Sequence, residues 1–176
     1  MHIKKALNKY PRLKKAVVPA DPEVRIPLTW PVGTYGLPMP KSGCPKGTKF
    51  PWHVGTRFHD TENFWAKNYW STPYDLAGKV YKNDMEQKFC MKTQVGDSGI
   101  SWPMGQYCIL KKGTCPEGFK EGYITWDDEN SKNSNKFTGQ LPDGIYDKNT
   151  QIEYCCRVDG HATNAIILPT DSPSSC

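Results

Sequence analysis

An internal repeat limits the folds available to this chain more than any other feature of its sequence. Three elements appear twice in the same order: W-P-x-G-x-Y, C-P-x-G and D-x-E-N, at 30–35, 44–47 and 60–63 and again at 102–107, 115–118 and 127–130. Ordered recurrence of separate elements indicates a duplicated framework. We therefore expect one domain built on pseudo-repeats.

A weaker third copy of the first element is visible at residues 142–146 (PDGIY). In this alignment Cys176, the last residue, stands where Cys44 and Cys115 stand in the two clear copies. This interpretation predicts a third unit that stops before it is complete.

The seven cysteines indicate an oxidising compartment. None lies in a C-x-x-C pair and no Cys/His cluster has zinc-finger spacing, so disulfides are expected, and with them a secreted, extracellular protein. Six cysteines can pair in about 15 ways that sequence does not rank. The expected disulfide cysteines are Cys44, Cys90, Cys108, Cys115, Cys155 and Cys156. One thiol is left for another chain or for a segment outside this one.

Short alternating stretches and frequent glycine and proline favour an all-β fold. The clearest stretch, 151–158 (QIEYCCRV), alternates so that Cys155 and Cys156 point to opposite faces of one strand. The two cysteines should therefore bond to different partners. We predict a single antiparallel, disulfide-stapled domain, either a β-prism or a β-sandwich. No stretch approaches the roughly 20 apolar residues of a membrane span.

The positive charge is concentrated at the N-terminus. Residues 1–29 hold seven basic and two acidic side chains, so their net charge of +5 equals that of the whole chain. Four prolines in this segment disfavour a continuous helix. We interpret 1–29 as a basic extended arm or linker and 30–176 as the domain. Because the domain itself is neutral, nucleic acid is not expected as a partner.

The acidic loop after Trp126 is the first candidate site. Asp127, Asp128 and Glu129 gather oxygen ligands of the kind that calcium takes, but without EF-hand spacing. A turn that bonds its own backbone and a loop that bonds sugar hydroxyls are the other interpretations. Paired carboxylates also suit a glycosidase, yet their duplication fits a framework better than one active site.

No nucleophile or metal motif such as H-E-x-x-H or G-x-S-x-G is present, so we predict that the chain is not an enzyme and has no cofactor. Aromatic side chains are the stronger functional signal, because their faces stack on sugar rings. Trp65 and Trp70 lie in a segment, 50–74, that the second copy lacks. Arg57 is suited to a planar carboxylate, and His59 lies beside it. Trp30 and Trp102 precede proline at equivalent repeat positions and are expected in the core.

Several of these strings resemble the apextrin C-terminal (ApeC) domain family: WPVGTYGLPMPKSGCP, GTRFHDTEN, WDDEN and LPDGIYDKNTQIEYCCRVDG, in this order. The resemblance covers residue 30 to about residue 169. It implies an invertebrate extracellular protein in which the domain occurs alone or after a perforin-like (MACPF) region. Family members usually continue past the position of Cys176, which implies that the C-terminal end here is truncated.

The resemblance implies two functions. Some members bind bacterial peptidoglycan and muramyl peptides in innate immunity, which makes a cell-wall glycan the expected partner. Other members are extracellular-matrix proteins, which implies an assembly domain joined to another chain through the basic arm or the unpaired cysteine. Candidate ligand contacts are Arg57, His59, Trp65, Trp70, Trp126, Asp127, Asp128 and Glu129.

Overall fold

The computed structural model describes residues 29–46, 48–61, 68–82, 84–96, 99–163 and 165–169. These residues form nine strands and no helix, which confirms the predicted all-β class. The strands are β1 (Tyr35–Pro38), β2 (Trp52–Asp60), β3 (Gly78–Val80), β4 (Asp84–Lys92), β5 (Gln106–Lys111), β6 (Lys120–Trp126), β7 (Lys136–Gly139), β8 (Gly144–Tyr146) and β9 (Thr150–Val158). The basic arm before residue 29, Trp65 and Cys176 lie outside the described residues.

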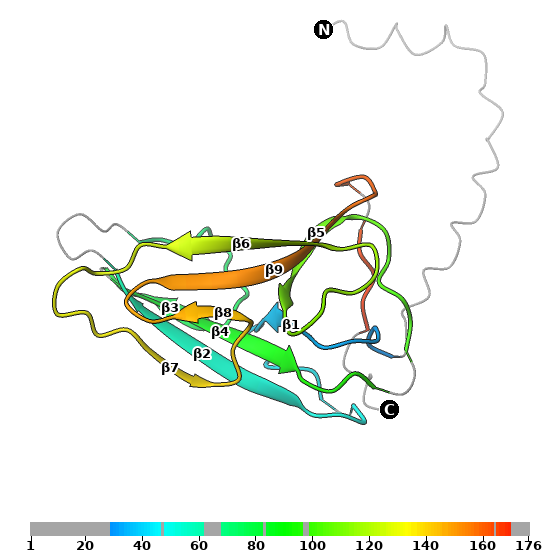
Figure 1. Ribbon diagram of the computed structural model, residues 1–176, viewed down its shortest axis with the longest axis horizontal. Helices are drawn as coiled ribbons and strands as arrows, with labels where there is room; N and C mark the ends of the chain where they lie inside the picture. Colours follow the sequence, from blue (N-terminus) through cyan, green and yellow to red (C-terminus); the bar gives the residue numbers. More distant parts are fainter. Residues whose placement is uncertain are drawn as a thin grey trace, which may run out of the picture.

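All strands belong to one antiparallel sheet with the order β6-β9-β5-β1-β4-β2-β7, to which β3 adds beside β4 and β8 beside β9. The sheet curls, so that β6 and β9 lie across from β2 and β7 (Figure 1). Ring contacts join the two sides: His59 of β2 lies 5.6 Å from Trp126 of β6, and Phe137 of β7 lies 6.3 Å from Tyr146 of β8. The curled sheet therefore encloses an interior, as a sandwich does.

The repeated motifs occupy equivalent places in the strand pairing. We call β1 to β4 the first half and β5, β6, β8 and β9 the second half. The central strand of each half lies between the first two strands of that half: β4 between β1 and β2, and β9 between β5 and β6. The matching pairs are Leu37 with Cys90 and Ile109 with Cys155, and Gly55 with Phe89 and Gly122 with Tyr154.

Residues 142–146 belong to the second half. Their strand β8 pairs with β9 as β3 pairs with β4, so they complete this half instead of starting a third unit. They nevertheless share one local contact with both W-P-x-G-x-Y elements. In each case the tyrosine hydroxyl donates to a proline carbonyl four residues earlier: Tyr35 to Pro31, Tyr107 to Pro103 and Tyr146 to Pro142.

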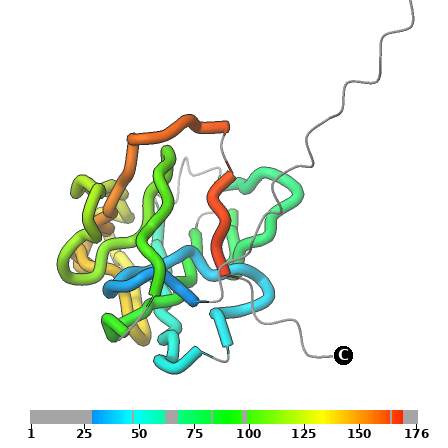
Figure 2. The backbone as a smooth tube through the Cα atoms, turned by 90° about the vertical axis from the view of Figure 1, so that its right-hand side faces the viewer, coloured from blue at the N-terminus to red at the C-terminus, as the bar shows by residue number. Residues whose placement is uncertain are grey.

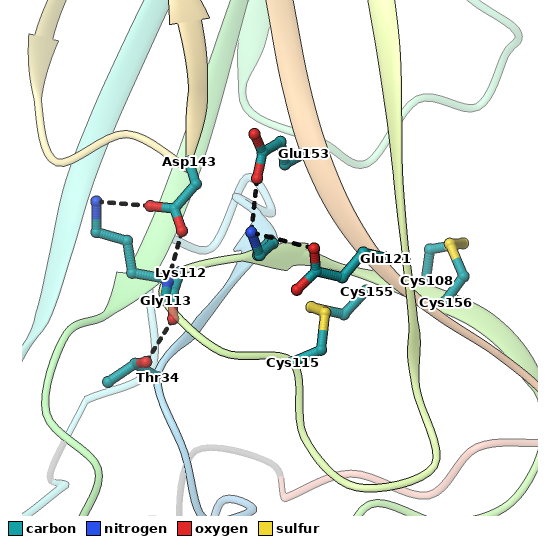
Figure 3. Close-up of a disulfide and its surroundings, with 11 residues drawn as sticks. Thr34, Cys108, Lys112, Gly113, Cys115, Glu121, Asp143, Glu153, Cys155 and Cys156 are labelled. Atoms are coloured by element: carbon teal, nitrogen blue, oxygen red, sulfur yellow. Dashed lines mark hydrogen bonds and ion pairs between the residues drawn. A yellow bond between two sulfur atoms is a disulfide. The ribbon is translucent and has the colours of Figure 1, made fainter.

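Three disulfides link the predicted cysteines: Cys44–Cys90, Cys108–Cys156 and Cys115–Cys155. The adjacent cysteines Cys155 and Cys156 bond to different partners, as predicted from their opposite side-chain directions. Figure 3 shows these two bridges on the chain around β9.

Two apolar clusters pack on opposite faces of the sheet. Ile109 belongs to one and its neighbour Leu110 to the other, because successive side chains in a strand alternate. The inner cluster contains Phe89, Met91, Leu110, Leu141 and Ile152. The outer cluster contains Tyr35, Trp102, Ile109 and Cys155 and is covered by half-buried groups that include Phe119 and Leu168.

Candidate functional site

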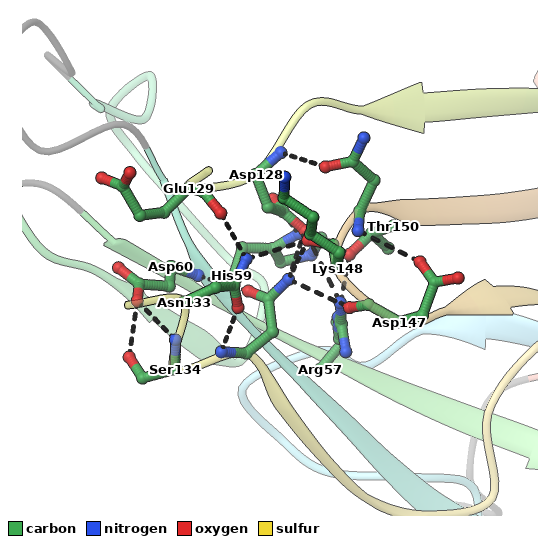
Figure 4. A network of polar contacts seen from close by, with 12 residues as sticks. Arg57, His59, Asp60, Asp128, Glu129, Asn133, Ser134, Asp147, Lys148 and Thr150 are labelled. Carbon is green, nitrogen blue, oxygen red and sulfur yellow. Dashed lines mark hydrogen bonds and ion pairs between the residues drawn. The ribbon is translucent and has the colours of Figure 1, made fainter. Parts of the chain in front are cut away.

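The acidic loop after β6 folds inward. Asp128 has no exposed surface, and its carboxylate accepts hydrogen bonds from Thr150 (2.6 Å) and Asn135 (2.8 Å). The His59 Nδ1 lies 3.3 Å from its other oxygen. Figure 4 shows these groups converging from β2, β9 and the loop. Both carboxylate oxygens are thus engaged by side chains of the protein itself, and not by the backbone of the loop as the turn interpretation expected.

Arg57 is the cationic partner in this buried network. It is 1% exposed, and its guanidinium lies 3.5 Å from Asp128 Oδ2 while Nε donates to Thr150 at 2.8 Å. Burial by itself would raise the pKa of Asp128, but hydrogen bonds from His59 and Thr150 outweigh it and hold that pKa below its usual value. The network therefore stabilises a charged carboxylate inside the curl of the sheet.

Most of the predicted contacts around this loop do not face solvent. His59 is fully buried, with Nε2 3.2 Å from Gln87 Oε1, and Glu129 is 6% exposed. Trp126 is half-buried, and Asp127 alone in the loop's D-D-E run is exposed. Among the described residues, no group of three or more His, Cys, Asp or Glu side chains could hold a metal ion.

Two carboxyl groups face each other where β2 and β4 pair. Asp60 faces Asp84 across the two strands, and Ser134 donates to Asp60 Oδ2 from its backbone (2.7 Å) and its hydroxyl (2.6 Å). Burial and then the charge of Asp60 raise the pKa of Asp84. Two carboxyl groups in contact favour a shared proton.

The aromatic segment that only the first half carries presents a different surface. Trp70 and Tyr74 form an edge contact at 3.7 Å, and neighbouring Tyr69 is 89% exposed. The buried Trp70 Nε1 and Tyr74 hydroxyl have no hydrogen-bond partner within the part of the chain that the structure describes.

A cleft of about 500 Å³ lies close to this segment. Its walls are mostly apolar and are formed by Trp30, Leu37, Pro38, Pro40, Ser42, Gly43, Pro45, Cys90 and Pro169. Residues 75–77 run beside its Pro40 wall, because Lys41 N–H donates to the Asp75 carbonyl (2.8 Å) and Pro40 forms a β-bridge with Leu76. Figure 2 shows the segment 165–169, which ends at Pro169, close to the beginning of the described chain.

A model of one protein family matches most of this chain. It describes ApeC, the C-terminal domain of apextrin, and it matches residues 30–175. The chain belongs to the ApeC family. No curated protein and no solved structure matches it. The match includes both halves of the ApeC sheet and every residue of the cleft wall.

The ApeC family and the three disulfides together fit an apextrin-like extracellular domain. None of the described residues forms a helix long and apolar enough to cross a membrane.

Sequence reasoning placed Trp30 in the core, but in this ApeC domain the side chain is half-buried and lines the cleft. Its equivalent, Trp102, is 5% exposed and lies in the core as predicted. Trp102 packs on the rings of Tyr35 (4.8 Å) and Phe119 (5.8 Å). The ring contact described for Trp30 is with Trp52 (5.0 Å). Trp52 is the counterpart of Phe119, because each lies three residues before the matched glycine of its strand, so Trp102 is distinguished by its additional contacts with Tyr35 and Tyr107.

Proposed function

We propose that this ApeC domain binds bacterial cell-wall glycan, either peptidoglycan or its muramyl peptide fragments, in the cleft beside Trp30 and does not cleave it. The observation that carries the proposal is the open, mostly apolar cleft beside Trp30 in the first half, whereas the equivalent tryptophan of the second half, Trp102, is buried in the core. Family membership supports the choice of ligand.

The chemistry of the cleft walls fits a muramyl peptide. The apolar walls offer Trp30 and Pro40 to the less polar face of a sugar ring or to the methyl groups of acetamido and lactyl substituents.

Binding without cleavage is supported by the state of the carboxylates. Asp128 is fully buried, and its carboxylate accepts hydrogen bonds from the protein's own side chains. Asp60 is 6% exposed and accepts a hydrogen bond from the Ser134 backbone. Neither is placed to protonate a glycosidic oxygen from a ligand in the cleft, because their hydrogen bonds hold them in the interior at the ends of β2 and β6. A glycosidase needs two carboxyls that flank the bond to be cleaved.

Retention on insoluble peptidoglycan tests the proposal. Trp30→Ala should weaken retention about fivefold, the loss of about 1 kcal/mol expected for one aromatic contact. Ser42→Trp should abolish retention, because a bulky side chain at this exposed wall position occupies the cleft while the Trp30 contacts remain. Tyr123→Ala is the matched control, since Tyr123 is a 67% exposed aromatic on β6, three strands away from β1.

Two results would reject the proposal. Retention by Ser42→Trp equal to that of the unchanged chain would show that the ligand lies outside the cleft. Release of soluble muropeptides during incubation would show that the domain cleaves its ligand. A melting temperature measured for each variant separates lost binding from lost folding.

An assembly function is the second candidate, favoured by the edge strand β6. Six of its seven residues are exposed, including Tyr123 and Ile124 at 67% and 50%. Exposed edges of this kind can accept a strand from another chain. Sedimentation that shows a concentration-dependent oligomer in the unchanged chain, lost in Ile124→Lys, would favour this candidate; a monomer at all concentrations would count against it.

A further inference from the structure

Two of the three disulfides belong to the framework that the halves share. Cys44–Cys90 and Cys115–Cys155 each tie a C-P-x-G loop to the central strand of its half, at positions with matching strand register. Cys108–Cys156 is different, because it joins directly paired residues of the neighbouring strands β5 and β9.

The first half shows that this third bridge is an addition to the framework. Its equivalent pair is Gly36 with Met91, one residue after Tyr35 and after Cys90. A Cβ on Gly36 would lie 2.3 Å from Met91 Sδ, so the methionine fills the space that two sulfurs occupy in the second half. The same strand pairing therefore forms without a disulfide here.

The third bridge is also the most accessible one. Cys108 is exposed and Cys156 half-buried, whereas Cys90 and Cys155, one member of each framework bridge, are 1% exposed. When Cys108–Cys156 opens, β5 and β9 stay paired from Gln106 to Leu110, and Cys115–Cys155 still ties the same strand β9. Opening this bridge therefore does not require the domain to unfold.

We propose that Cys108–Cys156 is a site of thiol–disulfide exchange for extracellular dithiol reductants. A thiolate of the dithiol attacks the sulfur of Cys108, the exposed residue of the pair, and Cys156 leaves as a thiolate that takes up a proton. The second thiol of the reductant then displaces Cys108, so that the protein bridge gains two electrons and two protons while the dithiol becomes a disulfide. Exposed bridges are the ones that exchange in this way.

The exchange changes how firmly the two halves are joined. β5 pairs with β9 on one side and with β1 on the other, so it is the strand through which the second half meets the first. With the bridge closed, β5 is held covalently to β9 along its own length; with the bridge open, hydrogen bonds and packing hold it there, and the remaining covalent tie is Cys115–Cys155 beyond its end.

Graded reduction under native conditions tests the proposal. The full chain carrying Cys176→Ser, so that its seventh thiol does not add to the signal, is treated with dithiothreitol, alkylated and mapped by mass spectrometry. Cys108 and Cys156 should be labelled about tenfold faster than Cys90 and Cys155, since access limits attack. Simultaneous labelling of all bridges, or earlier labelling of a framework bridge, would overturn the proposal.

Two further measurements test whether the exposure of Cys108–Cys156 causes its faster labelling. The preference for Cys108 and Cys156 should vanish in denaturant, and its persistence there would show that local sequence and not exposure causes it. Cys108→Ala/Cys156→Ala should retain a cooperative thermal transition, as should the bridge-reduced chain. Loss of the transition in both would show that the bridge is required for folding and would reject an exchange site.

Discussion

The two halves of the sheet share a framework but differ in what covers it. In each half a cation two residues beyond the bridged cysteine holds the loop that carries the tryptophan: Lys92 Nζ donates to the Gly33 carbonyl (2.6 Å) and Arg157 Nη1 to the Trp102 carbonyl (2.7 Å). Yet Trp102 is buried, whereas Trp30 lines an open cleft. Shared contacts thus preserve the fold, and the surface available to a ligand differs where the connecting segments differ.

Replacing each tryptophan with alanine should give the largest difference in unfolding free energy between the two halves. Trp102→Ala removes a core ring that packs on Tyr35 at 4.8 Å, and we expect a loss of about 4 kcal/mol in unfolding free energy. Trp30→Ala should lose only about 1.5 kcal/mol, because the side chain is half-buried. Urea titrations measure both; equal losses would show that the cleft wall is as much core as its counterpart.

The next largest loss of stability is expected from a substitution in the buried network around Asp128. Asp128→Asn leaves Arg57 without its charged partner in the interior and should lower stability by about 3 kcal/mol, whereas the exposed neighbour Asp127→Asn should change it little. The first half has Thr61 at the equivalent position.

The pH dependence follows from the lowered pKa of Asp128. A carboxyl with a depressed native pKa contributes stability that is present above its unfolded pKa of about 3.9 and is lost as the pH falls through the native pKa. Acid unfolding followed by tryptophan fluorescence should therefore show a shallower acid transition in Asp128→Asn. An unchanged transition would mean that other carboxyls control acid unfolding.

Removing the bridge that only the second half carries should have a moderate effect. Cys108 precedes Cys115 by seven residues and Cys156 follows Cys155 directly, so Cys115–Cys155 already closes most of the loop. For the remaining loop of about nine residues, Cys108→Ala/Cys156→Ala should lower stability by about 2.5 kcal/mol. The value for a 48-residue loop would be about 4 kcal/mol, and a loss of that size would show that the bridges act independently.

The smallest expected effect on stability comes from a substitution that makes the first half resemble the second. Asp84 faces Asp60 in β2, and the equivalent position in the second half is Asn149. Because the pKa of Asp84 is raised, its contribution to stability is present at low pH and is lost as the pH rises through that pKa. Asp84→Asn should gain about 0.5 kcal/mol at neutral pH and reduce this dependence. The exposed Asp75→Asn is the control, and an equal gain there would contradict the pair's role.

Much of the framework could be read from the chain. An antiparallel disulfide domain was predicted from the repeated motifs, the alternation of 151–158 and the cysteine count. The prediction that Cys155 and Cys156 bond to different cysteines is confirmed. These features are local: strand alternation sets side-chain direction, and proline and glycine set turns. Family membership followed from the same ordered strings.

The site depended on contacts between distant residues. The sequence predicts Arg57 and Asp128 as ligand contacts, but curling of the sheet brings β2 against the loop after β6 and buries both. Trp30 and Trp102 stand in the same motif, and only the segments that pack beside them decide which ring is covered. Residue type and spacing thus determined strands, turns and the bonding of cysteines, because these act over a few residues. Burial, and with it the surface left for a ligand, was decided by the tertiary structure, because it depends on what the rest of the chain places nearby.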